Sequence, residues 1–254
     1  MNTKQFKTGK DLSNGFLRRI DSISSDAGLQ IVAFDTYDET PSLKDRTRIS
    51  CKKLATPSRD FNVNLETDIE KVAMSELLAS KKNKRSITDL LIQQVIHYME
   101  NRNRNYVVAG NNKTFLSLGG YTNQEENDHE EADTLIIRCL RLVDDFIENK
   151  IVNVYSADTD VFLLLLSHSN KINWQCLYIH LVKGKVDIKL VCQKLGNETS
   201  KALLSFHGLT GSDTTGKFEG KSKQFWFRRF LTIDQNNSKL KKELADFQES
   251  KRRD

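Results

Sequence analysis

Three groups of acidic residues stand directly beside apolar segments of this 254-residue chain. Listed in chain order, they are Glu130, Glu131 and Asp133 in HEEADTLIIRCL, Asp158 and Asp160 in SADTDVFLLLL, and Asp213 in HGLTGSDTTGKF. A carboxylate beside a buried segment costs free energy unless it is protonated, paired or bound to a cation. Three such groups in one chain therefore predict a shared metal site.

Strands and helices must bring these side chains together. The apolar segment Leu29–Phe34 predicts a strand that ends at Asp35, and Ile151–Tyr155 predicts a strand that ends just before Asp158. Ligands of open α/β sheets bind in the crevice beyond the carboxyl ends of the strands. We therefore expect Asp35 and the two aspartates of DTD at one edge of a sheet.

The remaining elements are predicted from apolar periodicity. The expected helices are Gly15–Ile20, Val63–Leu78, Ile87–Met99, Glu130–Glu148, VFLLLLSH after Asp160, Val186–Leu195, Thr199–His207 and the QFWFRRFL segment. The further strands are Tyr106–Ala109, Lys113–Leu118 and Trp174–His180. We expect the charged stretch SKKNKRS to break the helical pattern, and Gly119-Gly120 to open an acidic loop.

Each acidic position also has an ordinary structural explanation. Asp35 could stand in a turn after its strand. The acidic residues of HEEADT could suit the positive end of a helix dipole. Asp158 and Asp160 could be turn and N-cap residues. The dipole explanation accounts for the first group well, but it does not account for the same arrangement in the other two.

The net charge of +5 is unevenly distributed. Basic residues gather in 44–53, 81–85, 217–229 and the C-terminal tail, and acidic residues gather in 125–133. A basic surface around an acidic pocket suits a metal-dependent enzyme that acts on a polyanion, although a solvated helix face is the alternative. The predicted nucleic-acid contacts are Lys44, Arg46, Arg48, Lys52, Lys53, Lys217, Lys221 and Lys223.

Composition favours some protein classes over others. The four cysteines form no C-x-x-C pair, which argues against a thiolate zinc site and favours a reducing, intracellular setting. The N-terminal residues lack the apolar core of a secretory signal, so we do not expect secretion. No apolar run is long enough for a membrane span, so we expect no membrane partner. Nucleus and cytoplasm both remain open.

Four segments carry a resemblance to a known family. FDTYDETPSLKD, HEEADT, SADTDVFLLL and LTGSDTTGKFEGKSK, in this order and spacing, resemble a group of PIN-like proteins. That group is related to the flap-endonuclease (XPG-type) nucleases and is found in transposon-rich animal genomes. The resemblance implies an α/β, PIN-like three-layer fold with a central, mostly parallel sheet flanked by helices. It covers 29–233, between a polar N-terminal extension (1–28) and a charged C-terminal helix or tail (234–254).

The resemblance also implies a site and an activity. In nucleases of this class, acidic side chains at the carboxyl edge of the sheet bind two Mg²⁺ or Mn²⁺ ions and hydrolyse a phosphodiester. The positions that match the family motifs, as both metal ligands and catalytic residues, are Asp35, Glu131, Asp133, Asp158, Asp160 and Asp213. The basic residues of 44–53 and 81–85 match an arch over single-stranded nucleic acid. Two metals about 3.5–4 Å apart can stabilise both the attacking and the leaving oxygen.

Two features depart from the family pattern. No acidic residue matches the one expected near the chain start, and Thr36 stands where a glycine is usual. The first hypothesis is therefore a metal-dependent nuclease acting on DNA or RNA, with structure-specific cleavage as one option. The second is an inactive PIN-like module that binds nucleic acid or a protein. The third is a phosphatase-like hydrolase of small phosphoesters.

Overall fold

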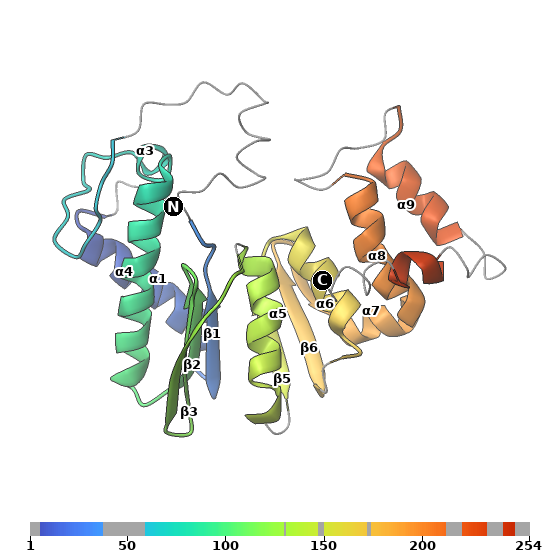
Figure 1. Cartoon of the computed structure of the whole chain (residues 1–254), viewed down its shortest axis with the longest axis horizontal. Coiled ribbons are helices and arrows are strands. Elements are labelled where there is room, and N and C mark those ends of the chain that lie inside the picture. The colour runs from blue at the N-terminus through green and yellow to red at the C-terminus, as the bar shows by residue number, and fades with distance from the viewer. Residues whose placement is uncertain are drawn as a thin grey trace. The chain divides into compact units, whose positions relative to one another are not determined.

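A computed structural model describes residues 6–37, 59–129, 131–146, 150–171, 174–211, 220–232 and 241–246 of the chain. The chain divides into two compact units, Met1–Leu140 and Arg141–Asp254. Each unit combines helices with a mixed sheet that contains one parallel strand pair, which confirms the predicted α/β class (Figure 1). Among the helices described, none has both the length and the apolar character that crossing a bilayer requires.

Both units contain consecutive strands and consecutive helices. Those of the first unit are α1 (Gly9–Ser24), β1 (Leu29–Ala33), α3 (Met74–Leu77), α4 (Lys81–Glu100), β2 (Asn105–Gly110), β3 (Lys113–Leu118), β4 (Tyr121–Glu126) and α5 (Ala132–Leu142), which runs two residues past the unit boundary. Those of the second unit are η2 (Asp144–Phe146), β5 (Ile151–Tyr155), α6 (Thr159–His168), β6 (Cys176–Leu181), β7 (Gly184–Asp187), α7 (Ile188–Leu195), α8 (Asn197–Leu209) and α9 (Lys223–Thr232).

The sheets differ from the predicted single, mostly parallel sheet. The described strands form a sheet of order β1-β2-β3-β4 and a second of order β5-β6-β7. Only β1-β2 and β5-β6 are parallel. The other strands are joined by short turns, which suit antiparallel pairing because a parallel crossover needs a dozen or more residues. At one of these turns, Gly119 and Gly120 both have positive φ, as a tight type I′ hairpin requires.

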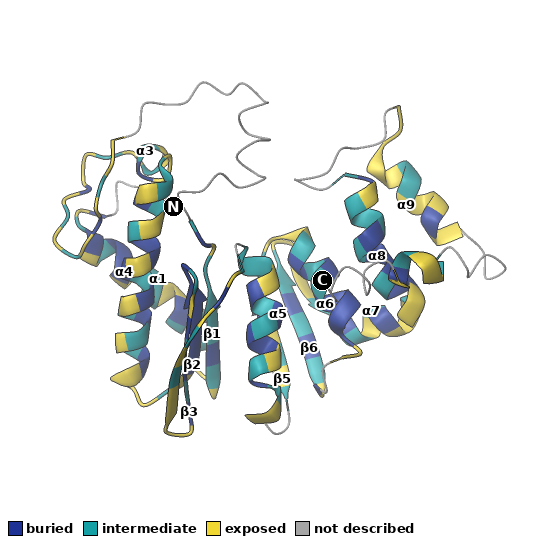
Figure 2. Cartoon of the chain, viewed as in Figure 1, coloured by how far each residue is buried: buried dark blue, intermediate teal, exposed yellow. Residues whose placement is uncertain are grey.

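Helices α1 and α4 and the first sheet share an apolar core. Ile20 of α1, Val95 and Met99 of α4, and Tyr106 and Val108 of β2 belong to one buried cluster. Strand β2 is buried from its second residue to its last (Figure 2). Strand β4 is largely exposed. The segment 9–24, which was predicted to be mostly polar lead-in, is thus a helix that contributes to the core of the first unit.

The start of α1 is fixed by a capping box. The Thr8 hydroxyl accepts a hydrogen bond from the Asp11 amide, and the Asp11 carboxylate accepts one from the Thr8 amide. The bond from the Thr8 amide lowers the pKa of Asp11 below its ordinary value. The helix lies so close to a neighbouring loop that a Cβ added at Gly9 would clash with the Asn64 carbonyl oxygen.

Three predictions in the first unit were wrong. The SKKNKRS stretch does not break a helix but forms the first turns of α4, where the buried Asn83 accepts from the Phe61 amide and donates to the Arg59 carbonyl. The expected helix Val63–Leu78 is confined to the short α3. The acidic loop after Gly120 begins instead with β4, a polar edge strand paired with β3.

In the second unit, α6 and α7 pack against each other and against α8, and α7 also packs on β6. Helix α6 supplies much of the core, because Val161, Leu163, Leu165 and Leu166 are all buried. The strand and helix predicted on either side of the DTD sequence are therefore confirmed. Their junction places two aspartates at the N-terminus of a buried helix.

Candidate metal centre

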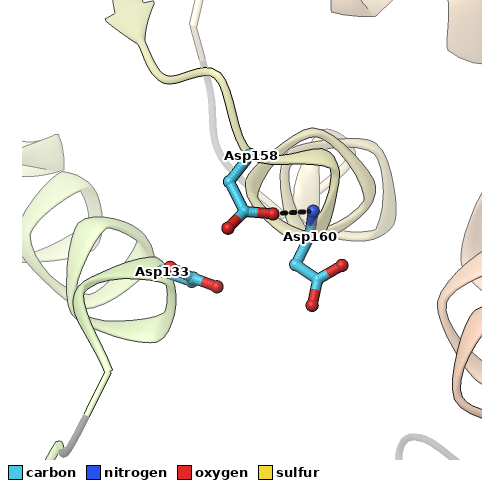
Figure 3. A group of neighbouring side chains, drawn as sticks. All are labelled: Asp133, Asp158 and Asp160. Carbon is cyan, nitrogen blue, oxygen red and sulfur yellow. Dashed lines mark hydrogen bonds between the residues drawn. The ribbon is translucent and has the colours of Figure 1, made fainter. Parts of the chain in front are cut away.

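Asp158 and Asp160 are positioned by the junction between β5 and α6. Asp158 is the N-cap of α6, and its Oδ1 accepts a hydrogen bond from the Asp160 amide at 2.9 Å. The Asp158 amide in turn donates to the Ser156 hydroxyl at 3.1 Å. Figure 3 shows the cap as a dashed line and both carboxylates at the start of α6. The predicted N-cap role of Asp158 is thus confirmed. Capping leaves the negative charge of the carboxylate in place.

Asp160 is held by a histidine from a different helix. The Asp160 Oδ1 lies 2.9 Å from Nε2 of His207, which is in α8. The ammonium of Lys223, at the start of α9, lies 2.8 Å from His207 Nδ1 and donates to the Gly211 carbonyl at 2.7 Å. The Asp160 side chain is 37 % exposed and that of His207 only 15 %. Lys223 of α9 therefore contacts His207 of α8, and His207 in turn contacts the Asp160 carboxylate of α6.

In the first unit, Asp35 anchors the start of α5. It follows β1, and its Oδ1 accepts from the Ala132 amide at 2.9 Å, while Oδ2 accepts from the Tyr37 hydroxyl at 3.3 Å. Hydrogen bonding of α5 begins at Glu131, whose carbonyl accepts from the Leu135 amide. Asp133 lies in the first turn, where a negative charge suits the helix dipole. The end of β1 and the acidic start of α5, which are far apart in sequence, are therefore tied together.

Thr36 reinforces the same connection. Its hydroxyl donates to the His129 carbonyl at 3.0 Å and accepts from the Asn112 amide at 3.4 Å. The residue is buried, with 6 % of its surface exposed. Thr36 thus joins the end of β1 to the β2–β3 turn and to the segment before α5.

In the second unit, Asp158 and Asp160 place two carboxylates at the start of α6 that could hold a metal ion (Figure 3). Asp133, in the first unit, is the third member of the group of aspartates from which we expect the metal ligands. Aspartate oxygens are suitable ligands for hard divalent cations. Of the other predicted ligands within the described residues, Asp35 and Glu131 are not members of this group. Asp213 lies outside the described residues.

The buried cysteine on α5 does not compete with these oxygens. Burial raises the pKa of the Cys139 thiol to about 12, so the thiol stays protonated near neutral pH. A metal-binding cysteine must be deprotonated.

Only two of the predicted nucleic-acid contacts fall within the described residues. Lys221 places its ammonium 5.2 Å from the centre of the Phe225 ring, and Lys223 contacts His207 as described above. The other predicted contacts, Lys44, Arg46, Arg48, Lys52, Lys53 and Lys217, lie outside the described residues.

Sequence reasoning missed the role of His207. The residue was predicted only as the end of a helix, although it opens the same HGLTGSD motif that contains Asp213. Its position within that motif was the available signal. Its partner Asp160 lies 47 positions earlier in the chain and could not be inferred from spacing.

Comparison of the chain with known protein families, with curated proteins and with solved structures finds no match in any of the three.

Proposed function

We propose that this protein is a divalent-metal-dependent nuclease of the PIN-like, flap-endonuclease kind, which hydrolyses phosphodiester bonds in DNA or RNA with two Mg²⁺ or Mn²⁺ ions. The observation that supports it most is the pair of carboxylates that Asp158 and Asp160 present at the start of α6, with Asp160 held by His207. Helix capping and helix-dipole effects explain Asp158 and Asp133 singly. They do not explain why a histidine holds a second carboxylate, that of Asp160, next to the capping Asp158, since like charges repel.

The chain's own residues would divide the work as follows. The three aspartates would hold the metal, and His207 would hold Asp160 in place. When bound, the metal supplies Lewis-acid stabilisation of the charge on the phosphodiester oxygens. Without a cation, the aspartates would repel a phosphodiester, so substrate should approach only when their charge is neutralised. Basic residues such as Lys221 would add attraction for a polyanion.

Cleavage by the purified full chain tests this proposal. Labelled flap, hairpin and single-stranded DNA and RNA substrates are incubated with Mg²⁺, Mn²⁺ or EDTA. We expect cleavage in at least one metal, none in EDTA, and a loss of more than about 100-fold in Asp158→Asn, because even outer-shell partners of metal sites contribute 10- to 100-fold.

A matched control comes from another helix of the same unit. Asp187 is the N-cap of α7 and accepts from the Leu190 amide, as Asp158 caps α6, but it is not a member of the acidic group. Asp187→Asn should therefore cleave like the unaltered protein. Equal activity in Asp158→Asn and Asp187→Asn would overturn the proposal.

An inactive PIN-like module that binds nucleic acid is the second candidate. It is favoured by the segment before β1, where an acidic residue on a strand is expected and the structure has the helix α1. Asp11 of that helix is engaged in its capping box. Binding of the same substrates without cleavage in either metal would select this candidate over the nuclease.

A further inference from the structure

We propose that His207 and Lys223 are positioning residues, which together orient Asp160 for metal binding. The inference rests on the proposed metal-dependent function and assigns parts of it to two residues outside the acidic group. It depends on two contacts: His207 Nε2 to Asp160 Oδ1 at 2.9 Å, and Lys223 Nζ to His207 Nδ1 at 2.8 Å.

The carboxylate decides which ring nitrogen of His207 carries the hydrogen. An ionised aspartate can only accept hydrogen bonds, so Nε2 must be the donor to Asp160. A lysine ammonium can only donate, so the nearer nitrogen, Nδ1, is left as the acceptor for Lys223. Both partners thus favour the same neutral tautomer, with the hydrogen on Nε2. Metal-site ligands are commonly oriented by outer-shell hydrogen bonds of this kind.

The packing gives the imidazole little freedom to move. The His207 side chain is 15 % exposed, and α8, which carries it, packs against α6, which carries Asp160. Next to His207 in the sequence, Phe206 stacks on the buried Phe230 of α9 with ring centres 4.7 Å apart. The three helices α6, α8 and α9 therefore fix the distance between the histidine and the carboxylate.

Lys223 also reaches the loop that follows α8. Its ammonium donates to the carbonyl of Gly211, the last described residue before Asp213 in the sequence. Its ammonium contacts Gly211 and His207, whereas the ammonium of Lys221 lies over the Phe225 ring. We therefore assign Lys223 to positioning within the site, and not to general attraction of a polyanion.

The first measurement detects the contacts without any metal. Nitrogen-15 NMR of histidine-labelled full chain reports which ring nitrogen of His207 carries the hydrogen. We expect the Nε2–H form in the unaltered protein, and a change in the His207 Nδ1 signal in Lys223→Met but not in Lys221→Met. The Nδ1–H form, or equal signals in both lysine variants, would overturn the proposed contacts.

The second measurement is Mn²⁺ affinity, determined from the electron paramagnetic resonance signal of the free ion. His207→Leu removes the donor, and we expect it to weaken Mn²⁺ binding by about 10- to 100-fold. His207→Gln keeps a side-chain donor near the position of Nε2, and it should recover most of the affinity. His97→Leu is the control, because His97 is an exposed residue of α4 whose ring contacts the Asn101 side chain.

The outcomes separate this inference from the proposed function. If the unaltered protein binds Mn²⁺ and His207→Leu, folded by circular dichroism, binds it equally well, the positioning role is refuted while the metal site stands. If His207→Gln is as weak as His207→Leu, the hydrogen bond is not what matters and the inference also fails. If the unaltered protein binds no Mn²⁺, the proposed function fails, and the inference that rests on it fails too.

Discussion

Replacing Asp158 with asparagine separates the two roles of this residue. Asp158 caps α6 through Oδ1 and is also a member of the acidic group. Asparagine caps a helix about as well as aspartate, so Asp158→Asn should keep the cap and remove only the charge. Asp158→Ala, in contrast, should lose both, and loss of the cap alone costs about 0.5–2 kcal/mol.

The size of each effect can be worked out from the structure. Two unit charges 4.8 Å apart interact with about 1 kcal/mol in water, and salt weakens this further. Relief of repulsion in Asp158→Asn should therefore change the free energy of unfolding by about 1 kcal/mol or less without metal. Mg²⁺ at 100 times its dissociation constant should stabilise the unaltered protein by about 2.7 kcal/mol, or roughly 5–10 °C in Tm.

Thermal unfolding followed by circular dichroism, with and without Mg²⁺, distinguishes these contributions. We expect nearly equal melting of Asp158→Asn and the unaltered protein in EDTA, and a Mg²⁺-dependent rise only in the unaltered protein and in Asp187→Asn. A rise of the same size in Asp158→Asn would refute the assignment of this carboxylate as a metal ligand.

Three further predictions concern the scaffold around the site. Thr36→Val should lower the free energy of unfolding by about 1–3 kcal/mol, measured in urea, because the buried hydroxyl bonded to the His129 carbonyl is lost, whereas Thr36→Ser should be milder. Burial and the bond to Glu100 raise the pKa of Tyr106 from 10.0 to about 12, so the folded protein holds this proton more tightly than the unfolded chain. That contribution to stability is complete below pH 10 and should be lost as the pH rises towards 12. In urea denaturation at several pH values, the free energy of unfolding of Tyr106→Phe should lack this pH dependence. The same pH dependence in Tyr106→Phe and in the unaltered protein would contradict the prediction. Cys139 should react with iodoacetamide at pH 8 only when α5 opens, and rapid labelling of the folded protein, located by mass spectrometry, would show that the helix carrying Asp133 is not stably packed.

The site was predictable where the signal is local. A β-branched strand, an aspartate at an N-cap position and an apolar run specify the β5–α6 junction, so Asp158 and Asp160 could be placed from the sequence. The contact of Asp160 with His207 could not, because it depends on how α6 packs against α8. The bond from the Ala132 amide to Asp35 likewise joins residues 97 positions apart.

The fold was mispredicted where tertiary pairing outweighs local preference, and also where a local preference was misjudged. Strand β4 contains the polar sequence YTNQEE and lacks apolar alternation, yet it pairs along its full length with β3 after the Gly119-Gly120 turn. In α4, charged residues were taken as a break, although lysine and arginine are good helix formers. The apolar residues of 63–78 imitate helical spacing, but Val63 and Ile69 enter the core from irregular backbone.

A change of metal preference tests the central claim most directly. Asp133→Cys replaces a hard oxygen ligand with a thiolate, which prefers softer cations such as Cd²⁺. Phosphodiester cleavage by this variant is measured in Mg²⁺ and in Cd²⁺ beside the control Asp144→Cys, which alters an aspartate outside the acidic group. If Asp133 binds the catalytic metal, Asp133→Cys should lose cleavage in Mg²⁺ and regain part of it in Cd²⁺, while the control follows the unaltered protein. Cleavage in Mg²⁺ at the unaltered rate by Asp133→Cys, or no cleavage by the unaltered protein in any metal, would contradict it.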